Sequence, residues 1–202
     1  MKKNFLRRYA AAWMALFSFA ALGTAQITET SEFPDVKIVN FGKMDDRYYR
    51  GGQPLQSDYQ SLKDLGVKTV IDLRNDPVEY EKPSVEALGM KYVNIPLNGW
   101  RFPNEAHVDQ FLKLMNDPET GTVYVHCKAG RHRAGMMGGV YRVANYGWDY
   151  DEAYKEMKKF RYSSWVFHGP MKGYVKEFAK RTKAAKAETA AAGLQAAAAN
   201  GN

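Results

Sequence analysis

The single cysteine of this chain, Cys127, lies between an apolar run and a glycine-containing segment that ends at Arg133. Residues 122–126 read as a short buried strand, and residues 133–146 read as a helix entered directly from the segment. Such a loop presents its backbone N–H groups, and the helix its positive dipole end, to one point in space. The sequence therefore predicts an anion-binding loop between a strand and a helix.

The spacing of Cys127 and Arg133 brings a thiol and a guanidinium to the same loop. A guanidinium can grip two oxygens of a tetrahedral oxyanion in a bidentate fork, which an ammonium cannot do. The positive surroundings favour the thiolate, which is the nucleophilic form of cysteine. The pattern favours displacement at phosphorus through a cysteinyl-phosphate. The alternative is a buried structural cysteine near an unrelated surface arginine.

Residues 126–133, His-Cys-Lys-Ala-Gly-Arg-His-Arg, resemble the HCxxGxxR signature of cysteine-dependent protein tyrosine phosphatases, in particular the compact bacterial dual-specificity branch. Residues 49–54, 66–74 and 92–97 are similar to further segments of that branch. The resemblance implies that Cys127 is the nucleophile, that Arg133 clamps the phosphate and that His126 tunes the thiolate. It implies hydrolysis of phosphate monoesters on phosphoproteins and requires no cofactor.

The interior of the loop supplies the expected substrate contacts. We expect these from four consecutive residues, Lys128, Ala129, Gly130 and Arg131. Lys128 and Arg131 either contact a second phosphate or are solvated at the surface. Similar basic loops occur in phosphoinositide phosphatases and in the fungal and plant branch that acts on inositol pyrophosphates, so a polyanionic small molecule is the alternative substrate. A phosphate-binding protein without turnover is a further alternative.

Two departures from the family pattern concern catalysis. The resemblance places an aspartate as general acid about thirty residues before the cysteine, but residues 96–103 contain no carboxylate. Candidate general acids elsewhere in the sequence are Asp76, Glu79, Glu105, Asp109 and His132. Ala134 stands where the family commonly has a serine or threonine whose hydroxyl assists departure of the thiolate. In the segment that lacks the acid, Trp100, Arg101 and Phe102 either form a wall over the site or pack elsewhere.

The rest of the chain predicts one α/β domain over residues 36–181, with a central, mainly parallel sheet flanked by helices. Expected strands are Val36–Asn40, Tyr48–Gly51, Thr69–Leu73, Tyr92–Ile95 and Val123–His126. Expected helices are Ser57–Leu65, Ser84–Leu88, Asn104–Met115, Arg133–Tyr146, Tyr150–Phe160 and Gly173–Lys180. Ser57 and Asn104 are expected to cap helices, and Gly66, Gly89 and Gly147 to end them. We also expect Asp72, at the end of a buried strand, to pair with Arg50.

The two ends of the chain differ from this domain in composition. Residues 1–25 combine basic residues, an apolar run and a small-residue exit, which is typical of a bacterial secretory signal peptide and predicts a periplasmic or secreted protein. A retained membrane anchor is the alternative. Residues 26–35 are expected to form a disordered linker. The alanine-rich residues 182–202 are expected to form a frayed helix or a disordered tail.

Charge and cysteine count limit the partners of the protein. The net charge of +7 falls to about +3 without the four basic residues of the leader, so we expect no nucleic-acid partner. The expected state is a monomer without a membrane anchor after leader removal. His107 and His168 lack ligand spacing, so no metal site is predicted. Sulfur transfer and arsenate reduction are disfavoured, because those loops differ in spacing or need further cysteines.

Overall fold

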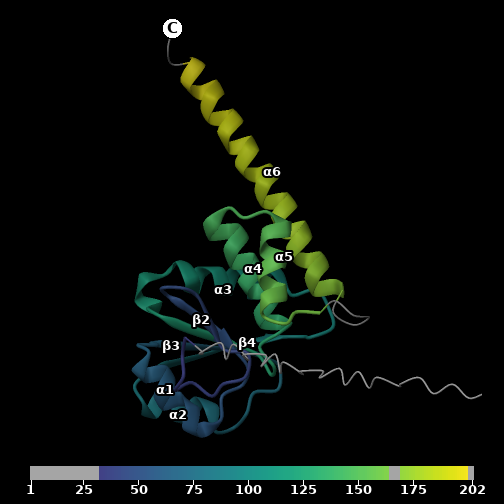
Figure 1. Cartoon of the computed structure of the whole chain (residues 1–202). Coiled ribbons are helices and arrows are strands. Elements are labelled where there is room, and N and C mark those ends of the chain that lie inside the picture. The colour runs from purple at the N-terminus through teal and green to yellow at the C-terminus, as the bar shows by residue number, and fades with distance from the viewer. Residues whose placement is uncertain (1–31, 164–168, 200–202) are drawn as a thin grey trace, which may run out of the picture. The chain divides into compact units, whose positions relative to one another are not determined.

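The computed structural model of the protein describes residues 32–163 and 169–199. Five strands form one sheet in the order β1-β2-β5-β3-β4 (Figure 1). β1 is antiparallel to β2, whereas the β2–β5, β5–β3 and β3–β4 pairs are parallel. This arrangement confirms the predicted α/β class and the mainly parallel sheet. The strands are β1 (Gly42–Asp45), β2 (Tyr48–Gly51), β3 (Thr69–Arg74), β4 (Lys91–Leu97) and β5 (Val123–His126).

Helices connect these strands and extend beyond the last of them. They are α1 (Tyr59–Asp64), α2 (Glu81–Ala87), α3 (Glu105–Asn116), α4 (Arg133–Tyr146), α5 (Tyr150–Lys159) and α6 (Gly169–Ala199), with 3-10 turns at Gln56–Asp58 and Pro118–Thr120. The predicted α4 agrees in both bounds with the structure. Asn104 caps α3 by accepting a hydrogen bond from the N–H of Ala106. Gly147 ends α4 in the left-handed conformation, as expected for a helix stop.

Alternating side chains on the sheet separate two layers of core. Val70 and Tyr124 pack with Leu62 of α1 and Val85 of α2. Their sequence neighbours Ile71, Val123 and Val125 join the larger core on the opposite face, which includes residues of α3, α4, α5 and α6. Figure 1 shows α1 and α2 on one side of the sheet and α3, α4 and α5 on the other. Both faces of the parallel strands are buried, which explains their apolar runs.

Two local predictions near the start of the domain are wrong. Val36–Ile38 form no regular secondary structure, and Val39 and Asn40 form a turn in which Asn40 adopts a positive φ of 56° that an extended strand does not allow. The antiparallel edge strand is β1 instead. Ser57 does not cap a helix, because the segment opens with a 3-10 turn in which Asp58 accepts a hydrogen bond from the N–H of Leu55.

Two helices are longer than predicted. α2 begins at Glu81 rather than at residue 84, because Pro83 falls in the first turn, where a missing N–H costs no helical hydrogen bond. α6 runs from Gly169 to Ala199 and so includes most of the alanine-rich segment as helix. Alanine has the highest helix propensity, which explains the continuation.

The amino-terminal predictions are only partly open to comparison. The expected leader at 1–25, most of the expected linker and His168 lie outside the described residues. Within the range of the linker, the ring of Phe33 packs edge-on against Phe41 and Tyr49 at centroid distances of 5.2 and 5.7 Å. Among the described residues, no helix has the length and hydropathy needed to cross a membrane.

Candidate active site

The predicted anion loop lies at the carboxyl ends of the parallel strands. β5 ends at His126, Cys127 begins the loop, and α4 starts at Arg133. The buried Cys127 contributes to a pocket of about 420 Å³. The other lining residues are Asn75, Asp76, Gly99, Trp100, Lys128, Ala129, His132, Arg133 and Met171. The fold thus places a thiol, a guanidinium and a helix N-terminus around one small hollow.

Hydrogen bonds from outside fix the loop backbone. The carbonyl of Gly130 accepts from Arg50 Nη2 at 2.7 Å and from Asn40 Nδ2 at 2.8 Å. The carbonyl of Lys128 accepts from the N–H of Gln53 at 3.2 Å. In a trans peptide the N–H points opposite to its carbonyl, so the amides of Ala129 and Arg131 face the interior of the loop. Two amides are therefore oriented for an anion without a bound ligand.

Gly130 allows the loop to close tightly. Its φ is +66°, and a Cβ at this position would lie 2.4 Å from the carbonyl carbon of Gly51. Both the conformation and the close backbone approach require glycine. The tight shape of the loop thus has a steric cause in the neighbouring strand end.

His126 is tied to a buried carboxylate rather than to solvent. Its Nε2 lies 2.7 Å from Glu81 Oε1 and 3.8 Å from Asp72 Oδ1, and all three side chains are fully buried. The N–H direction departs from a well-aligned hydrogen bond, so we describe the contact with Glu81 as an ion pair. The imidazole also stacks on Tyr124 with a centroid distance of 5.5 Å. These contacts fix the residue that directly precedes Cys127.

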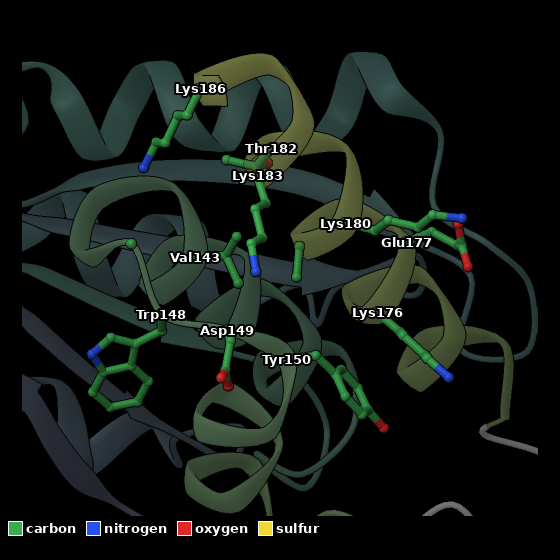
Figure 2. Close-up of a pocket in the computed structure, with 12 residues that line it drawn as sticks. Val143, Trp148, Asp149, Tyr150, Lys176, Glu177, Lys180, Thr182, Lys183 and Lys186 are labelled. Carbon is green, nitrogen blue, oxygen red and sulfur yellow. The ribbon is translucent and has the colours of Figure 1, made fainter. Parts of the chain in front are cut away.

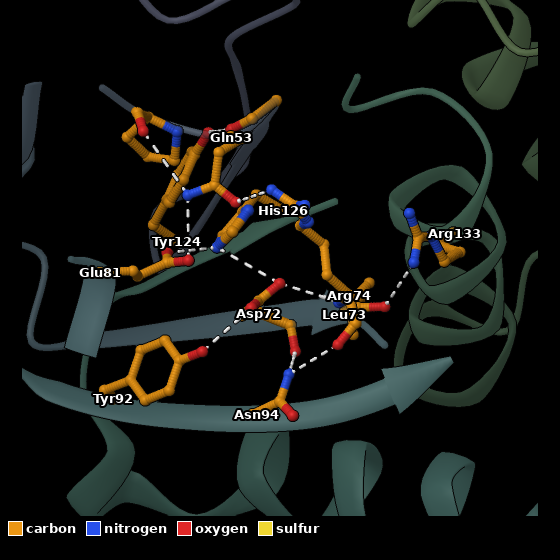
Figure 3. Close-up of polar contacts among 12 residues, drawn as sticks. Gln53, Asp72, Leu73, Arg74, Glu81, Tyr92, Asn94, Tyr124, His126 and Arg133 are labelled. Carbon is orange, nitrogen blue, oxygen red and sulfur yellow. Dashed lines mark hydrogen bonds and ion pairs between the residues drawn. The ribbon is translucent and has the colours of Figure 1, made fainter. Parts of the chain in front are cut away.

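A chain of polar contacts extends from His126 to the rim of the pocket (Figure 3). Gln53 Nε2 donates to Glu81 Oε2 at 2.9 Å, and Gln53 Oε1 accepts from Arg74 Nη1 at 2.8 Å. Arg74 then donates to both carboxylate oxygens of Asp76, at 3.2 and 3.0 Å. The network joins the buried contacts of His126 to an acid in the pocket.

The two acids at the ends of this network have lowered pKa values. Burial raises the pKa of Glu81, but the 2.7 Å contact with His126 and the hydrogen bond from the Gln53 amide outweigh burial and leave the pKa below its usual range. Hydrogen bonds from Arg74 lower the pKa of the exposed Asp76. Both groups are therefore carboxylates at neutral pH.

The predicted pair between Arg50 and Asp72 is wrong. Arg50 instead donates to the loop carbonyl of Gly130 and lies 4.2 Å from the ring centroid of Phe160. Asp72 accepts hydrogen bonds from the Tyr92 hydroxyl at 2.9 Å and from the N–H of Arg74 at 2.8 Å. Burial raises the pKa of Asp72. Sequence spacing could not reveal that neighbouring strand ends would supply these partners.

The structure separates the candidate acids. Asp76 and His132 line the pocket with Cys127. Glu105 is held by Arg181 at 2.7 Å and by the Tyr174 hydroxyl at 2.8 Å, away from the pocket lining. The exposed residues Glu79 and Asp109 are also absent from that lining.

Only some of the residues predicted to contact the substrate line the pocket. Lys128 and Ala129 line the pocket, whereas Arg131 is exposed outside the lining and Gly130 serves to close the loop. Trp100 lines the pocket and is 59% exposed. The predicted wall does not extend to its neighbours: Arg101 is exposed outside the lining, and Phe102 packs near Tyr174.

Ala134 is fully buried at the start of α4. A threonine at this position would add two heavy atoms to a packed core, whereas a serine would add one. The structure thus gives a packing reason for the small side chain, in addition to its missing hydroxyl.

Sequence reasoning found the loop but missed its supports. Asn40, Gln53, Asn75 and Glu81 were not predicted to act at the site. Gln53 lies in the family-like segment 49–54, which was a usable signal, but Glu81 stands in a helix whose start was misplaced.

The ligand atoms of Asp72, Glu81 and His126 lie within 4.8 Å of one another and could by type hold a metal ion. Asp72 and Glu81 Oε2 already accept hydrogen bonds from protein donors. Glu81 Oε1 and both ring nitrogens of His126 are buried without a hydrogen bond, and the 2.7 Å contact of Nε2 with Oε1 is the ion pair described above.

A larger hollow of about 650 Å³ lies elsewhere, between the end of α4, the start of α5 and α6 (Figure 2). Val143, Trp148 and Tyr150 contribute apolar surface, and four lysines of α6 border it: Lys176, Lys180, Lys183 and Lys186. The cysteine is in the other pocket. Chemistry, rather than size, identifies the candidate active site.

The fold and this site define a cysteine-dependent phosphatase of the dual-specificity type. The family model described as "DSP-PTPase phosphatase fused to NAD+ Kinase" matches residues 28–167. The chain belongs to this family and is a tyrosine or dual-specificity-type phosphatase, which confirms the prediction from the signature.

Individual proteins agree with this family membership. OCA1 of Mycosarcoma maydis, designated a tyrosine-protein phosphatase, is 32% identical over 129 residues, covering 60% of this chain and 79% of that protein. The inositol diphosphatase DSP3 of Arabidopsis thaliana is 28% identical over 126 residues, covering 59% and 61%. The catalytic core of the PP-IP phosphatase SIW14 from S. cerevisiae has the same fold, with a TM-score of 0.61 at 19% identity, covering 73% and 96% of the two chains.

Proposed function

We propose that the protein hydrolyses phosphate monoesters in two steps through a cysteinyl-phosphate. The Cys127 thiolate attacks phosphorus, the bond to the leaving oxygen breaks, and that oxygen takes up a proton. Water then attacks the phosphoenzyme, breaks the S–P bond and releases inorganic phosphate and the thiolate. The observation that carries this proposal is the placement of Cys127 and Arg133 in one pocket at the N-terminus of α4.

The proposed roles of the other loop groups follow from their orientation. The inward amides of Ala129 and Arg131 and the guanidinium of Arg133 stabilise the equatorial oxygens as charge builds up on them. Glu81 holds His126, the residue before the nucleophile, in place. Asp76, ionised by its contact with Arg74, is suited to accept a proton from the attacking water in the second step.

The decisive experiment is Cys127→Ser. We expect the serine variant to lose phosphate release by at least about a thousandfold, because a hydroxyl is a far weaker nucleophile than a thiolate. It should still bind inorganic phosphate, since the amides and Arg133 remain. Release of phosphate from p-nitrophenyl phosphate and calorimetric titration with phosphate measure the two properties. Residual hydrolysis within tenfold of the wild type would rule out the covalent route.

The leading substrate class is a phosphorylated protein, as in the tyrosine and dual-specificity phosphatases. An inositol polyphosphate is the second candidate, favoured by one observation: Lys128 lines the pocket as a cation beyond the Arg133 clamp. The inositol diphosphatase from A. thaliana supports this candidate at the level of family. A second anionic group would give Lys128 a direct partner.

Replacing Lys128 by Ala tests the choice, with Arg131→Ala as the matched control. If the substrate is polyphosphorylated, Lys128→Ala should lower kcat/KM for an inositol polyphosphate about tenfold and for an aryl phosphate by less than about threefold. Arg131→Ala should affect both weakly, because Arg131 lies outside the pocket lining. Equal losses in Lys128→Ala would favour the phosphoprotein.

We also propose that the protein is exported and acts outside the cytoplasm as a monomer without a membrane anchor. The basic and apolar segments of residues 1–25 support export. Expression with and without these residues, followed by cell fractionation, tests this point. Recovery of the full-length protein in the cytoplasm, or retention of the uncleaved segment in the membrane, would contradict it.

A further inference from the structure

The guanidinium of Arg133 is anchored through one of its nitrogens. Arg133 Nη1 donates to Asn75 Oδ1 at 3.0 Å, to the carbonyl of Leu97 at 3.2 Å and, more weakly, to the carbonyl of Leu73 at 3.4 Å. Figure 3 shows Arg133 directed toward the end of β3 at Leu73. The two carbonyls belong to the ends of β3 and β4, and Asn75 follows β3 directly. Three acceptors around one nitrogen restrict both the position and the plane of the guanidinium.

This anchoring leaves the other edge of the guanidinium available. Within the described residues, Arg133 Nε and Nη2 make no hydrogen bond or ion pair. Those two N–H groups form the fork that grips a phosphate bidentately. The contacts of Nη1 therefore orient the arginine without occupying the donors that an oxyanion needs.

The three acceptors are also electrically neutral. A carboxylate at position 75 could accept the same hydrogen bond, but it would compensate the positive charge that attracts the substrate. The adjacent residue, Asp76, is a carboxylate, and both of its oxygens are held by Arg74. The connection after β3 thus gives the hydrogen bonds of its carboxylate to Arg74 and a neutral amide to Arg133, so that Asp76 acts on Arg133 only through space.

We propose that Asn75 is the positioning residue of Arg133, and that its neutral side chain sets the affinity of the pocket for the phosphoryl group. The inference rests on the proposed role of Arg133 as the phosphate clamp. Asn75 itself does not contact the reacting atoms. It acts through the arginine, by fixing the guanidinium without placing a second carboxylate against it.

The experiment compares Asn75→Asp with Asn75→Ala, using inorganic phosphate as the probe. Asn75→Asp keeps the acceptor but adds a charge, whereas Asn75→Ala removes the acceptor without adding one. Because the added charge acts next to the clamp, we expect Asn75→Asp to weaken phosphate binding about tenfold or more and Asn75→Ala only about two- to fivefold. In turnover of p-nitrophenyl phosphate, Asn75→Asp should raise KM more than it lowers kcat.

Asn116→Asp is the matched control. Asn116 also accepts a side-chain hydrogen bond through Oδ1, from Asn145, but it lies at the end of α3 outside the pocket lining. The Asn116→Asp substitution should leave phosphate binding and KM unchanged. Thermal unfolding of all variants checks that each is folded.

The inference depends on which of the two Asn75 variants binds inorganic phosphate more weakly. A residue that only supports the fold would tolerate the isosteric Asp better than Ala, so binding by Asn75→Asp equal to wild type, or tighter than by Asn75→Ala, would overturn the proposal. Absence of competitive phosphate binding by the wild type would instead count against the proposed function. The two failures are therefore distinguishable.

Discussion

Two connections flank the anion loop, and they contribute to it in different ways. The connection after β3, residues 75–81, supplies Asn75 to Arg133, Asp76 to the pocket and Glu81 to His126. The connection after β4, residues 98–104, contributes Gly99 and the exposed Trp100 to the lining and carries no carboxylate. Both leave the sheet at the same edge, so position alone does not assign a role. What differs is the supply of charged and hydrogen-bonding groups.

The contrast explains how this chain departs from the pattern implied by its signature. The resemblance places the general acid on the connection after β4, where this sequence has none. The structure places Asp76 on the connection after β3, but in an ionised state that suits a base better than an acid. The predictions below test this division of roles, beginning with the largest expected effect.

The absence of an acid after β4 predicts a steep dependence on the leaving group. We expect kcat/KM for aryl phosphates with acidic phenols to exceed that for alkyl phosphates by about 10²–10⁴, the usual worth of protonation assistance. A series of substituted aryl phosphates plotted against phenol pKa measures the slope. A flat plot would mean that an acid operates, and Asp76→Asn and His132→Gln would then identify it.

The buried end of the connection after β3 predicts a large effect on stability. Glu81→Ala removes the partner of a fully buried His126 and should lower the free energy of unfolding by about 3–5 kcal/mol. The matched control is Glu86→Ala, on the same helix, where an exposed glutamate lies 3.9 Å from Lys82 and should cost less than about 0.5 kcal/mol. Urea unfolding of both variants checks the difference. Equal losses would show that the ion pair contributes nothing beyond surface electrostatics.

The pH dependence of the same pair has a defined sign. The folded pKa of Glu81 lies below its unfolded value, which is about 4.3 for a free glutamate. Its stabilising contribution is therefore complete above that unfolded value and is lost as the pH falls through the folded pKa. The stability difference between wild type and Glu81→Ala should thus shrink on acidification below about pH 4.

We expect the smallest effect on activity from a substitution in the connection after β4. Trp100→Ala should raise KM for aryl phosphates about three- to tenfold, the worth of one aromatic contact, and change kcat by less than about twofold. Phe102→Ala is a matched control, because Phe102 is similarly exposed but lies outside the pocket lining. A loss in kcat with Trp100→Ala as large as its loss in KM would assign this connection a role in the chemistry.

The sequence by itself determined the central element of this protein. The spacing from Cys127 to Arg133, with a strand before and a helix after, predicted the anion loop, because these features are encoded within about twenty-five consecutive residues and depend on local backbone geometry. The bounds of α4 and the parallel sheet follow from the same local and periodic signals, whereas the phosphatase family followed from the resemblance of residues 126–133 to a known signature.

Only the tertiary structure decided how that loop is supported. Glu81 reaches His126 over 45 positions of sequence, and Asn75 reaches Arg133 over 58, because parallel strands end at one edge and bring their connections together. The pairing expected for Arg50 failed for the same reason, since its partner proved to be the carbonyl of Gly130 in a loop 80 positions away. Periodicity reports which face of an element is buried, but it does not report which polar groups will meet where several elements converge.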